Sequence, residues 1–348
     1  MFTGFGGLLH GAPGERKPAS LCEEASLRAI LNILSSQAIF RNFGSFKKSV
    51  SICLINLTPQ QVSGNPAHLM WTIGNLNVQN SALVGALIVD FAIQWIGWAV
   101  SAAFRTEKLY DALGSSAFAA CAIGTLTYAK YYHARQIVAT VFVMVWAARL
   151  GGFLFFRVLK TGSDSRFDEV KSQPLKYLIY WTVQAVWVWV TLLPVIILNG
   201  SDHNPGLWPS DIVGGLLWAV GFTIETTADF QKFAFKQDPA NKGRFISTGV
   251  WKYARCPNYG GEMLVWWGLW LISIPVLDGG YWVCVVSPLF LMFLLLFVSG
   301  VPLQEKQAQE RWGQESAYQA YRRSTFLLFP IPKFWHKEEP AVQHRLTA

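Results

Sequence analysis

Charged residues are scarce in this chain. They make up 14% of its 348 residues, whereas apolar residues make up 52%, and this balance argues against an ordinary soluble globular domain. The composition indicates an integral membrane protein, and 16 Trp and 24 Phe suit a surface that meets lipid and its aromatic belts. A net charge of +8 is small for nucleic-acid binding in a chain mostly embedded in lipid, so we expect no nucleic-acid partner.

Cysteine is also rare, and two nucleotide-binding motifs are missing. The five cysteines show no CxxC or other metal-ligand spacing, so we predict free thiols, with no metal site and no disulfide framework. The sequence has neither a Gly-x-Gly-x-x-Gly motif after a strand nor a Walker motif, so helices and loops would have to hold any nucleotide. The first 20 residues lack a sustained apolar run, so we expect membrane insertion to rely on the first span.

Long apolar segments are abundant from residue 83 onward. We predict an all-α, polytopic membrane helical bundle of about seven transmembrane helices over residues 83–335. It follows an irregular or interfacial extension at 1–82 and precedes a disordered tail at 336–348. Within the bundle domain, Leu303–Arg323 predicts one helix after the last span. The predicted spans are Leu83–Phe104, Tyr110–Ala129, Ile137–Leu159, Tyr177–Leu198, Asp211–Ala228, Met263–Leu277 and Tyr281–Ser299.

Basic residues are distributed unevenly between the connecting loops. If all seven segments span, 19 Lys and Arg fall on one side and two on the other, leaving the N-terminal extension aside. The positive-inside rule then places the C-terminus and the 229–262 loop in the cytosol. The Asn-x-Ser/Thr triplets at Asn56 and Asn199 would lie on the opposite side, where glycosylation is possible.

Apart from Asp111 and Asp211 at the starts of their segments, four charged residues lie inside the predicted spans, where a charge costs about 2.5–3.5 kcal/mol at a helix centre. Arg149 is near the middle of its segment and must face a polar cavity or a partner. Arg157 could instead snorkel to the cytosolic interface. For Asp90 both a structural hydrogen bond and a catalytic role stay open. Glu225 belongs to a larger pattern.

That pattern is a polar stripe along the fifth span. Glu225, Asp229, Lys232 and Lys236 follow at i, i+4, i+7 and i+11, which is one face of a helix. The stripe leads from the membrane interior toward the cytosol. Local Asp–Lys pairing is the alternative interpretation, but it does not explain Glu225.

A polar stretch, WKYARCPNYGGE at Trp251–Glu262, runs directly into the sixth apolar segment. We expect a loop this rich in hydrogen-bonding groups, at the start of a membrane helix, to bind something polar. Basic side chains around it are suited to the phosphates of a dinucleotide. They are Lys236, Lys242, Arg244, Lys252 and Arg255.

These residues, with two later motifs, resemble the steroid 5α-reductase family, in its broad and mostly uncharacterised branch. The similarity covers roughly residues 83–335. The motifs are Asp229-Phe-Gln-Lys-Phe-Ala-Phe-Lys236, Gly249-x-Trp251-x-x-x-Arg255-x-Pro257-Asn258-Tyr259-x-Gly261-Glu262, Gly300-Val-Pro-x-x-Glu305 and Tyr321-Arg-Arg-Ser-Thr325-x-x-x-Phe329-Pro330.

The resemblance implies a seven-helix reductase of the endoplasmic reticulum membrane. Such an enzyme takes hydride from NADPH and saturates a C=C bond conjugated to a carbonyl in a lipophilic substrate that is steroid-like, a terpenoid or a lipid. Glu225 stands where the steroid enzymes have Asn, and Glu305 where they have His, which argues against a steroid. We predict that the residues that bind the cofactor are Asp229, Lys236, Arg244, Arg255, Asn258, Tyr259, Glu262 and Glu305.

The proton donor is less defined than the cofactor site. Reduction needs a donor near the carbonyl oxygen and a proton for the α-carbon. A Tyr hydroxyl stays protonated at neutral pH, so Tyr128, Tyr177 and Tyr180 are catalytic candidates together with Glu225. Each tyrosine is equally explained as an interfacial belt residue.

Two other classes of protein compete with a reductase. Membrane S-adenosylmethionine-dependent methyltransferases of the isoprenylcysteine or phospholipid type share an Arg-x-Pro-x-Tyr-x-Gly loop followed by a Glu-bearing helix. A sulfonium cofactor needs no basic cluster, so the five cations favour NADPH. A non-catalytic membrane scaffold would leave Arg149 and Glu225 unexplained. We expect a lipophilic small molecule and membrane lipids as partners, and no obligate protein partner is evident.

Overall fold

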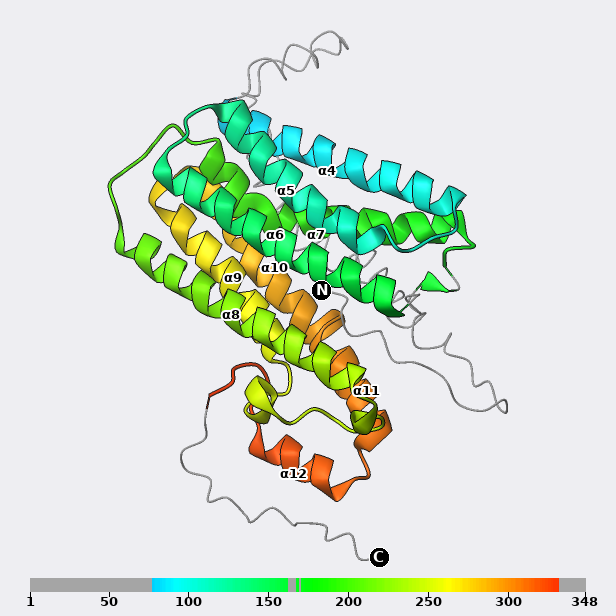
Figure 1. Cartoon of the computed structure of the whole chain (residues 1–348). Helices are drawn as coiled ribbons and strands as arrows, with labels where there is room; N and C mark the ends of the chain where they lie inside the picture. The colour runs from blue at the N-terminus through cyan, green and yellow to red at the C-terminus, as the bar shows by residue number, and fades with distance from the viewer. Residues whose placement is uncertain (1–76, 162–166, 169, 332–348) are drawn as a thin grey trace, which may run out of the picture.

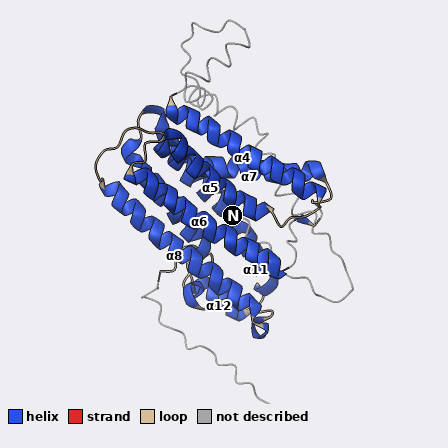
Figure 2. Cartoon of the chain, turned by 45° about the horizontal axis from the view of Figure 1, so that its top comes forward, coloured by secondary structure: helices blue, strands red, loops and turns tan. Residues whose placement is uncertain are grey.

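The structure is a computed structural model, and the part of the chain that it describes is all-helical (Figures 1 and 2). The described residues are 77–161, 167–168 and 170–331, and among them one isolated bridge, between Ala254 and Phe326, is the sole extended pairing. The all-α prediction is therefore confirmed. The predicted extension, up to residue 76, and the predicted tail lie outside the described residues.

The bundle consists of helices that coincide in order with the seven apolar segments, most of them long and α10 only eight residues. The α7 helix is the most buried of the candidate membrane helices and packs on α4, α5, α9 and α10. The helix α4 begins at Val78, five residues before the predicted start. The bundle helices are α4 (Val78–Ala103), α5 (Tyr110–Ala129), α6 (Ala134–Thr161), α7 (Pro174–Asn199), α8 (Pro209–Gln237), α9 (Pro257–Ser273) and α10 (Val286–Phe293).

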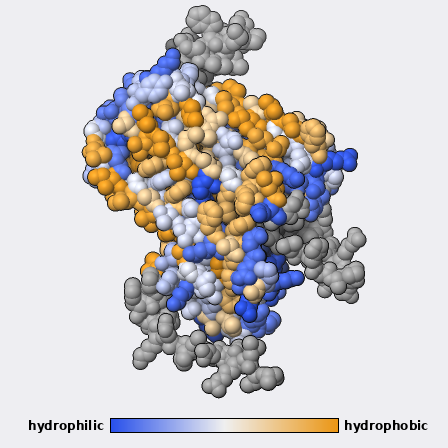
Figure 3. All heavy atoms as spheres, in the orientation of Figure 1, coloured by the Kyte–Doolittle hydropathy of each residue, from blue (hydrophilic) through white to orange (hydrophobic). Residues whose placement is uncertain are grey.

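Among the described residues, five helical segments are long and apolar enough to cross a membrane: α4, α5, α6, α7 and the segment from Gly279 to Trp312. The surface of the bundle is correspondingly rich in apolar side chains (Figure 3). Helices α8 and α9 are not among these five segments. The helix α9 has only 17 residues, and α8 carries the charged stripe. A membrane protein is thus supported, while the count of seven spans stays a prediction.

Outward-facing side chains on α8 nevertheless resemble those of a lipid-facing helix. Ile212, Leu216 and Val220 recur every fourth residue and are 55%, 62% and 49% exposed. Such an apolar stripe on the outer face of a bundle helix is what contact with lipid favours. The charged residues of α8 lie on its other face.

Glycines allow α8 and α9 to pack with their backbones in close contact. A Cβ atom on Gly221 would lie 2.6 Å from the Gly261 carbonyl oxygen, and one on Gly214 would lie 2.6 Å from that of Gly268. Small residues at such a seam are typical of helix pairs in membranes. The seam brings the polar faces of the two helices together.

A cap of short elements covers one end of the bundle (Figure 1). A π-helical turn at Leu294–Val298 joins α10 to α11 (Val301–Trp312), which is followed by α12 (Ser316–Ser324). The prediction of one helix over Leu303–Arg323 is wrong, because the chain turns at Gly313 between α11 and α12. The connection between α8 and α9 completes the cap with 3₁₀ turns at Pro239–Asn241 and Gly249–Lys252.

Asn199 lies at the opposite end of the bundle and is fully buried. Its amide nitrogen donates to the Ala122 carbonyl (3.1 Å), to Thr125 Oγ1 (3.1 Å) and to Thr140 Oγ1 (3.2 Å). An amide committed in this way has no room for a glycan. Asn56 lies outside the described residues.

Candidate functional site

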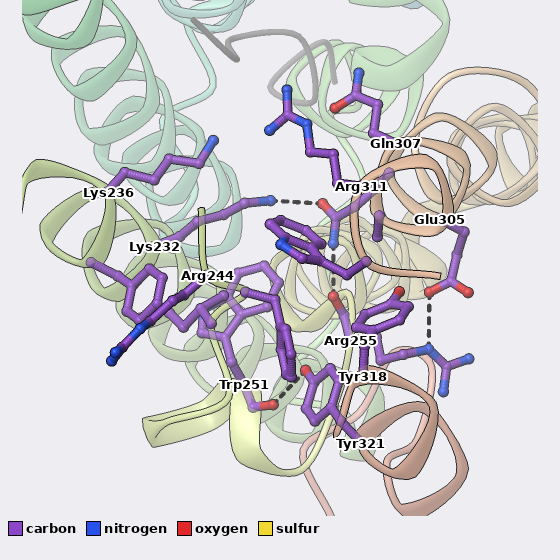
Figure 4. Close-up of a pocket in the computed structure, with 16 residues that line it drawn as sticks. Lys232, Lys236, Arg244, Trp251, Arg255, Glu305, Gln307, Arg311, Tyr318 and Tyr321 are labelled. Atoms are coloured by element: carbon purple, nitrogen blue, oxygen red, sulfur yellow. Dashed lines mark hydrogen bonds and ion pairs between the residues drawn. The ribbon is translucent and has the colours of Figure 1, made fainter. Parts of the chain in front are cut away.

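A pocket opens where the C-terminal end of α8 meets the cap (Figure 4). It encloses about 750 Å³, including the part that is open to solvent. Its walls come from α8, from the connection between α8 and α9, and from α11 and α12. Segments far apart in the sequence therefore meet around one space.

Cationic side chains from two helices point toward one side of this pocket. Lys232 and Lys236 come from α8 and Arg311 from α11 (Figure 4). Lys236 lies within electrostatic range of Lys232 and Arg311, and also of Arg157 on α6. The Asp229 carboxylate also lies within electrostatic range of the Lys232 ammonium. An anion bound among these groups would relieve their mutual repulsion.

Aromatic rings form another wall of the pocket. The Phe245 ring lies 5.2 Å from that of Tyr318 and 5.3 Å from that of Tyr321. The Lys232 ammonium lies 4.8 Å from the centre of the Trp251 ring, within the range of a cation–π interaction. Burial raises the pKa of Tyr321, whose hydroxyl donates to the Trp251 carbonyl at 2.7 Å. This wall suits a flat ring system.

Arg255 and Glu305, both predicted to bind the cofactor, pair with each other. Arg255 Nε lies 2.9 Å from Glu305 Oε1, and Arg255 Nη1 donates to the carbonyls of Arg322 (2.8 Å) and Thr325 (3.1 Å). This geometry ties the α8–α9 connection to α11 and α12, so the pair shapes the pocket. Arg244 lines the pocket, but in Figure 4 its guanidinium points away from the other cations.

One turn deeper on α8, a buried polar cluster connects α8 to α6. Arg149 on α6 forms ion pairs with Glu225 (2.7 Å) and Asp229 (2.8 Å) on α8. Trp146 Nε1 donates to the second oxygen of Glu225 at 3.1 Å. Arg149 was predicted to face a polar cavity or a partner, and its partner is the carboxylate pair on the polar stripe.

The helix α9 contributes Asn258, Tyr259 and Glu262, and it starts earlier than predicted. It begins at Pro257, a favoured first position of a helix, so these three residues lie on its first turns and not in a loop. All three are buried. Asn258 Oδ1 and Glu262 Oε1 have no hydrogen-bond partner among the described residues. Such orphaned polar groups are suited to meeting a ligand.

The three candidate tyrosines are placed away from this cluster. Tyr128 is 57% exposed near the end of α5. Tyr177 is fully buried, and its hydroxyl donates to the Thr106 carbonyl at 3.1 Å. Tyr177 and Tyr180 pack in a separate aromatic group with Tyr110 and Trp181. Of the four catalytic candidates, the structure brings Glu225 alone beside the predicted cofactor residues.

Other residues selected from the sequence have local roles. Arg157 lies 3.8 Å from Asp111 on α5, so it has a partner in the protein. Asp90 is fully buried, and neither of its carboxylate oxygens has a hydrogen-bond partner among the described residues.

Burial raises the pKa of Cys256 to about 12, which keeps this thiol protonated and unreactive at neutral pH. Within the described part, no group of residues is arranged to hold a metal ion.

Sequence reasoning missed Arg311, Gln304 and Trp146. The residues of α11 that line the pocket follow at i, i+1, i+3, i+4, i+7 and i+8, which is one face of the helix: Gln304, Glu305, Gln307, Ala308, Arg311 and Trp312. The spacing can be read from the sequence, but tertiary packing decides which face of this polar helix turns toward the pocket. The sequence did not single out Trp146, because tryptophan is common in apolar membrane segments.

Comparison with known proteins places this all-helical membrane protein in a family. The family model described as "Protein of unknown function (DUF1295)" matches residues 97–325, and the chain belongs to this family. A similar protein is the "Uncharacterized protein C594.04c" of Schizosaccharomyces pombe, with 25% identity over 227 residues. That match covers 56% of this chain and 65% of the relative. No solved structure matches the chain significantly.

Proposed function

We propose that this protein is an NADPH-dependent reductase that saturates a C=C bond conjugated to a carbonyl in a lipophilic substrate. The observation that carries the proposal is the set of cations, Lys232, Lys236 and Arg311, beside an aromatic wall in one pocket. NADPH brings phosphates and a flat adenine to such a place. The resemblance to the steroid 5α-reductase family supports the same assignment.

The residues present fit the cofactor in charge and in shape. Lys232, Lys236 and Arg311 would hold its phosphates, and Phe245 with Tyr318 would face the adenine. The orphaned Asn258 Oδ1 is an acceptor suited to the amide of the nicotinamide. When bound, NADPH supplies the hydride. The protein supplies the binding, the orientation and a buried site from which water is excluded.

The same proposal specifies a topology and a location. We infer seven membrane spans, with α8 and α9 inserted among the five clearly apolar segments. The cap then lies in the cytosol, where NADPH is available, and the substrate enters from the bilayer. An endoplasmic reticulum location follows from the family resemblance.

Nucleotide-dependent thermal stability in detergent tests this function. A ligand at 100 times its Kd adds about 2.7 kcal/mol to the stability of the folded state. We expect NADPH to raise the melting temperature more than NADH or S-adenosylmethionine. Stabilisation by S-adenosylmethionine alone would support a methyltransferase instead.

Two substitutions on one helix test the location of the cofactor. Arg311→Ala removes a cation from the pocket and should weaken NADPH binding about tenfold or more. Lys306→Ala is the matched control, because Lys306 lies on α11 but is 49% exposed and pairs with Glu310. Equal NADPH affinity in the two variants would show that NADPH does not bind in the proposed pocket.

A separate experiment addresses the substrate. A search of lipid extracts for a product two hydrogens heavier would identify it.

A further inference from the structure

The buried cluster holds more acidic groups than basic ones. Glu225, Asp229 and Glu262 are each at least 94% buried, and Arg149 is the one guanidinium that pairs with carboxylates there among the described residues. Arg149 is shared between Glu225 and Asp229. Glu262 therefore has no cation of its own within the described structure.

The surplus carboxyl is built into the close contact of α8 with α9. A Cβ atom on Gly261 would lie 2.6 Å from the Glu225 amide nitrogen, so the first turns of α9 press directly against this part of α8. Glu262 follows Gly261 and interacts electrostatically with Asp229, Arg149 and Glu225.

Two orphaned oxygens mark the cluster as a ligand site. Glu262 Oε1 and Asn258 Oδ1 are both acceptors, both lie one helical turn apart on α9, and neither has a hydrogen-bond partner among the described residues. Their side chains belong to residues only 4% and 5% exposed. Buried acceptors among three carboxyl groups are suited to a ligand that is a hydrogen-bond donor and carries positive charge.

The ring of oxidised nicotinamide is such a cation, whereas the reduced ring is neutral. We propose that Glu225, Asp229 and Glu262 form an electrostatic site that favours the oxidised nicotinamide, so that the protein binds NADP⁺ more tightly than NADPH. This inference rests on the proposed function. Preferential binding of the oxidised form makes the bound cofactor a stronger hydride donor, because the carboxylates stabilise the positive charge that hydride loss leaves on the ring.

A comparison of the two redox forms isolates this effect, because NADP⁺ and NADPH carry the same phosphates and the same adenine. Their dissociation constants would be measured by calorimetry on the full-length protein in detergent, with no substrate present. For the wild-type protein we expect NADP⁺ to bind about tenfold more tightly than NADPH, as one nearby buried charge suffices for such a ratio. Equal affinities, or tighter NADPH binding, would overturn the inference without any variant.

Glu262→Gln then tests the residue. We expect NADP⁺ affinity to fall about tenfold more than NADPH affinity, because the lost charge acts mainly on the oxidised ring. Glu310→Gln is the control, because Glu310 is a carboxylate on α11 whose side chain is 63% exposed; it should change neither affinity. Parallel losses for both forms in Glu262→Gln would indicate a merely structural role. If the wild-type protein binds neither form, the proposed function itself fails.

Discussion

At the scale of the residue, Arg149 is the centre of the buried site. Its guanidinium pairs with two carboxylates, Glu225 and Asp229, that would otherwise be buried in the bundle without a compensating charge. Removing one partner of a buried ion pair costs about 3–5 kcal/mol, because the other charge is left uncompensated.

We therefore expect Arg149→Met to lower the thermal stability of the detergent-solubilised protein markedly. The triple variant Arg149→Met, Glu225→Gln, Asp229→Asn removes the charges together and should recover much of that loss. Scanning fluorimetry of both variants measures the difference. A triple variant less stable than the single one would show that the ion pairs are not the cause.

Part of this site was predictable from single residues. The stripe from Glu225 to Lys236 follows from helical spacing alone, and the insertion cost of Arg149 implied a buried partner. Arg255 shows the limit of such reasoning. Its charge suggested a phosphate contact, but its geometry with Glu305 and two carbonyls depends on the position of α11 and α12, which the sequence does not specify.

At the scale of the element, the α8–α9 pair decides whether the site exists. The two helices supply every carboxylate of the buried cluster, and glycines at their seam set the distance between them. The helices of the bundle were predictable because most of them coincide with long apolar segments of the sequence. The start of α9 was placed six residues late, since Asn258 and Tyr259 look like loop residues until Pro257 is read as the first residue of a helix.

A pair of glycine substitutions on α8 tests the seam. Gly→Ala within a helix gains up to about 1 kcal/mol from helix propensity. At Gly221 the new methyl group would collide with the Gly261 carbonyl, and overpacking costs about 1–3 kcal/mol. At Gly215 nothing lies within 4 Å of the new atom.

We expect Gly221→Ala to lower both the melting temperature and the NADPH affinity, and Gly215→Ala to leave both unchanged or to raise stability slightly. The same chemical change thus has opposite signs at two sites on one helix. Equal effects at the two positions would contradict the close packing of α8 on α9.

At the scale of the whole molecule, the protein is a membrane bundle with a polar cap at one end. The bundle presents apolar side chains outward, while the pocket and its cations lie where the cap meets α8 (Figures 1 and 3). Hydropathy and charge asymmetry predicted this general layout. The arrangement of the cap was not predictable, because α11 and α12 are polar and their packing depends on contacts distant in sequence.

The central claim is that the pocket faces the cytosol and its supply of NADPH. The 29 residues of α8 span about 43 Å, so the loops at its two ends should lie on opposite sides of the membrane. Single cysteines at the exposed positions Leu207 and Lys242, in a chain without its native cysteines, report these sides.

A membrane-impermeant maleimide applied to sealed, cytosol-side-out vesicles is the direct measurement. We predict that Lys242→Cys is labelled in intact vesicles and that Leu207→Cys is labelled only after permeabilisation. Labelling of Leu207→Cys in intact vesicles, with Lys242→Cys protected, would place the pocket away from the nucleotide pool and contradict the account.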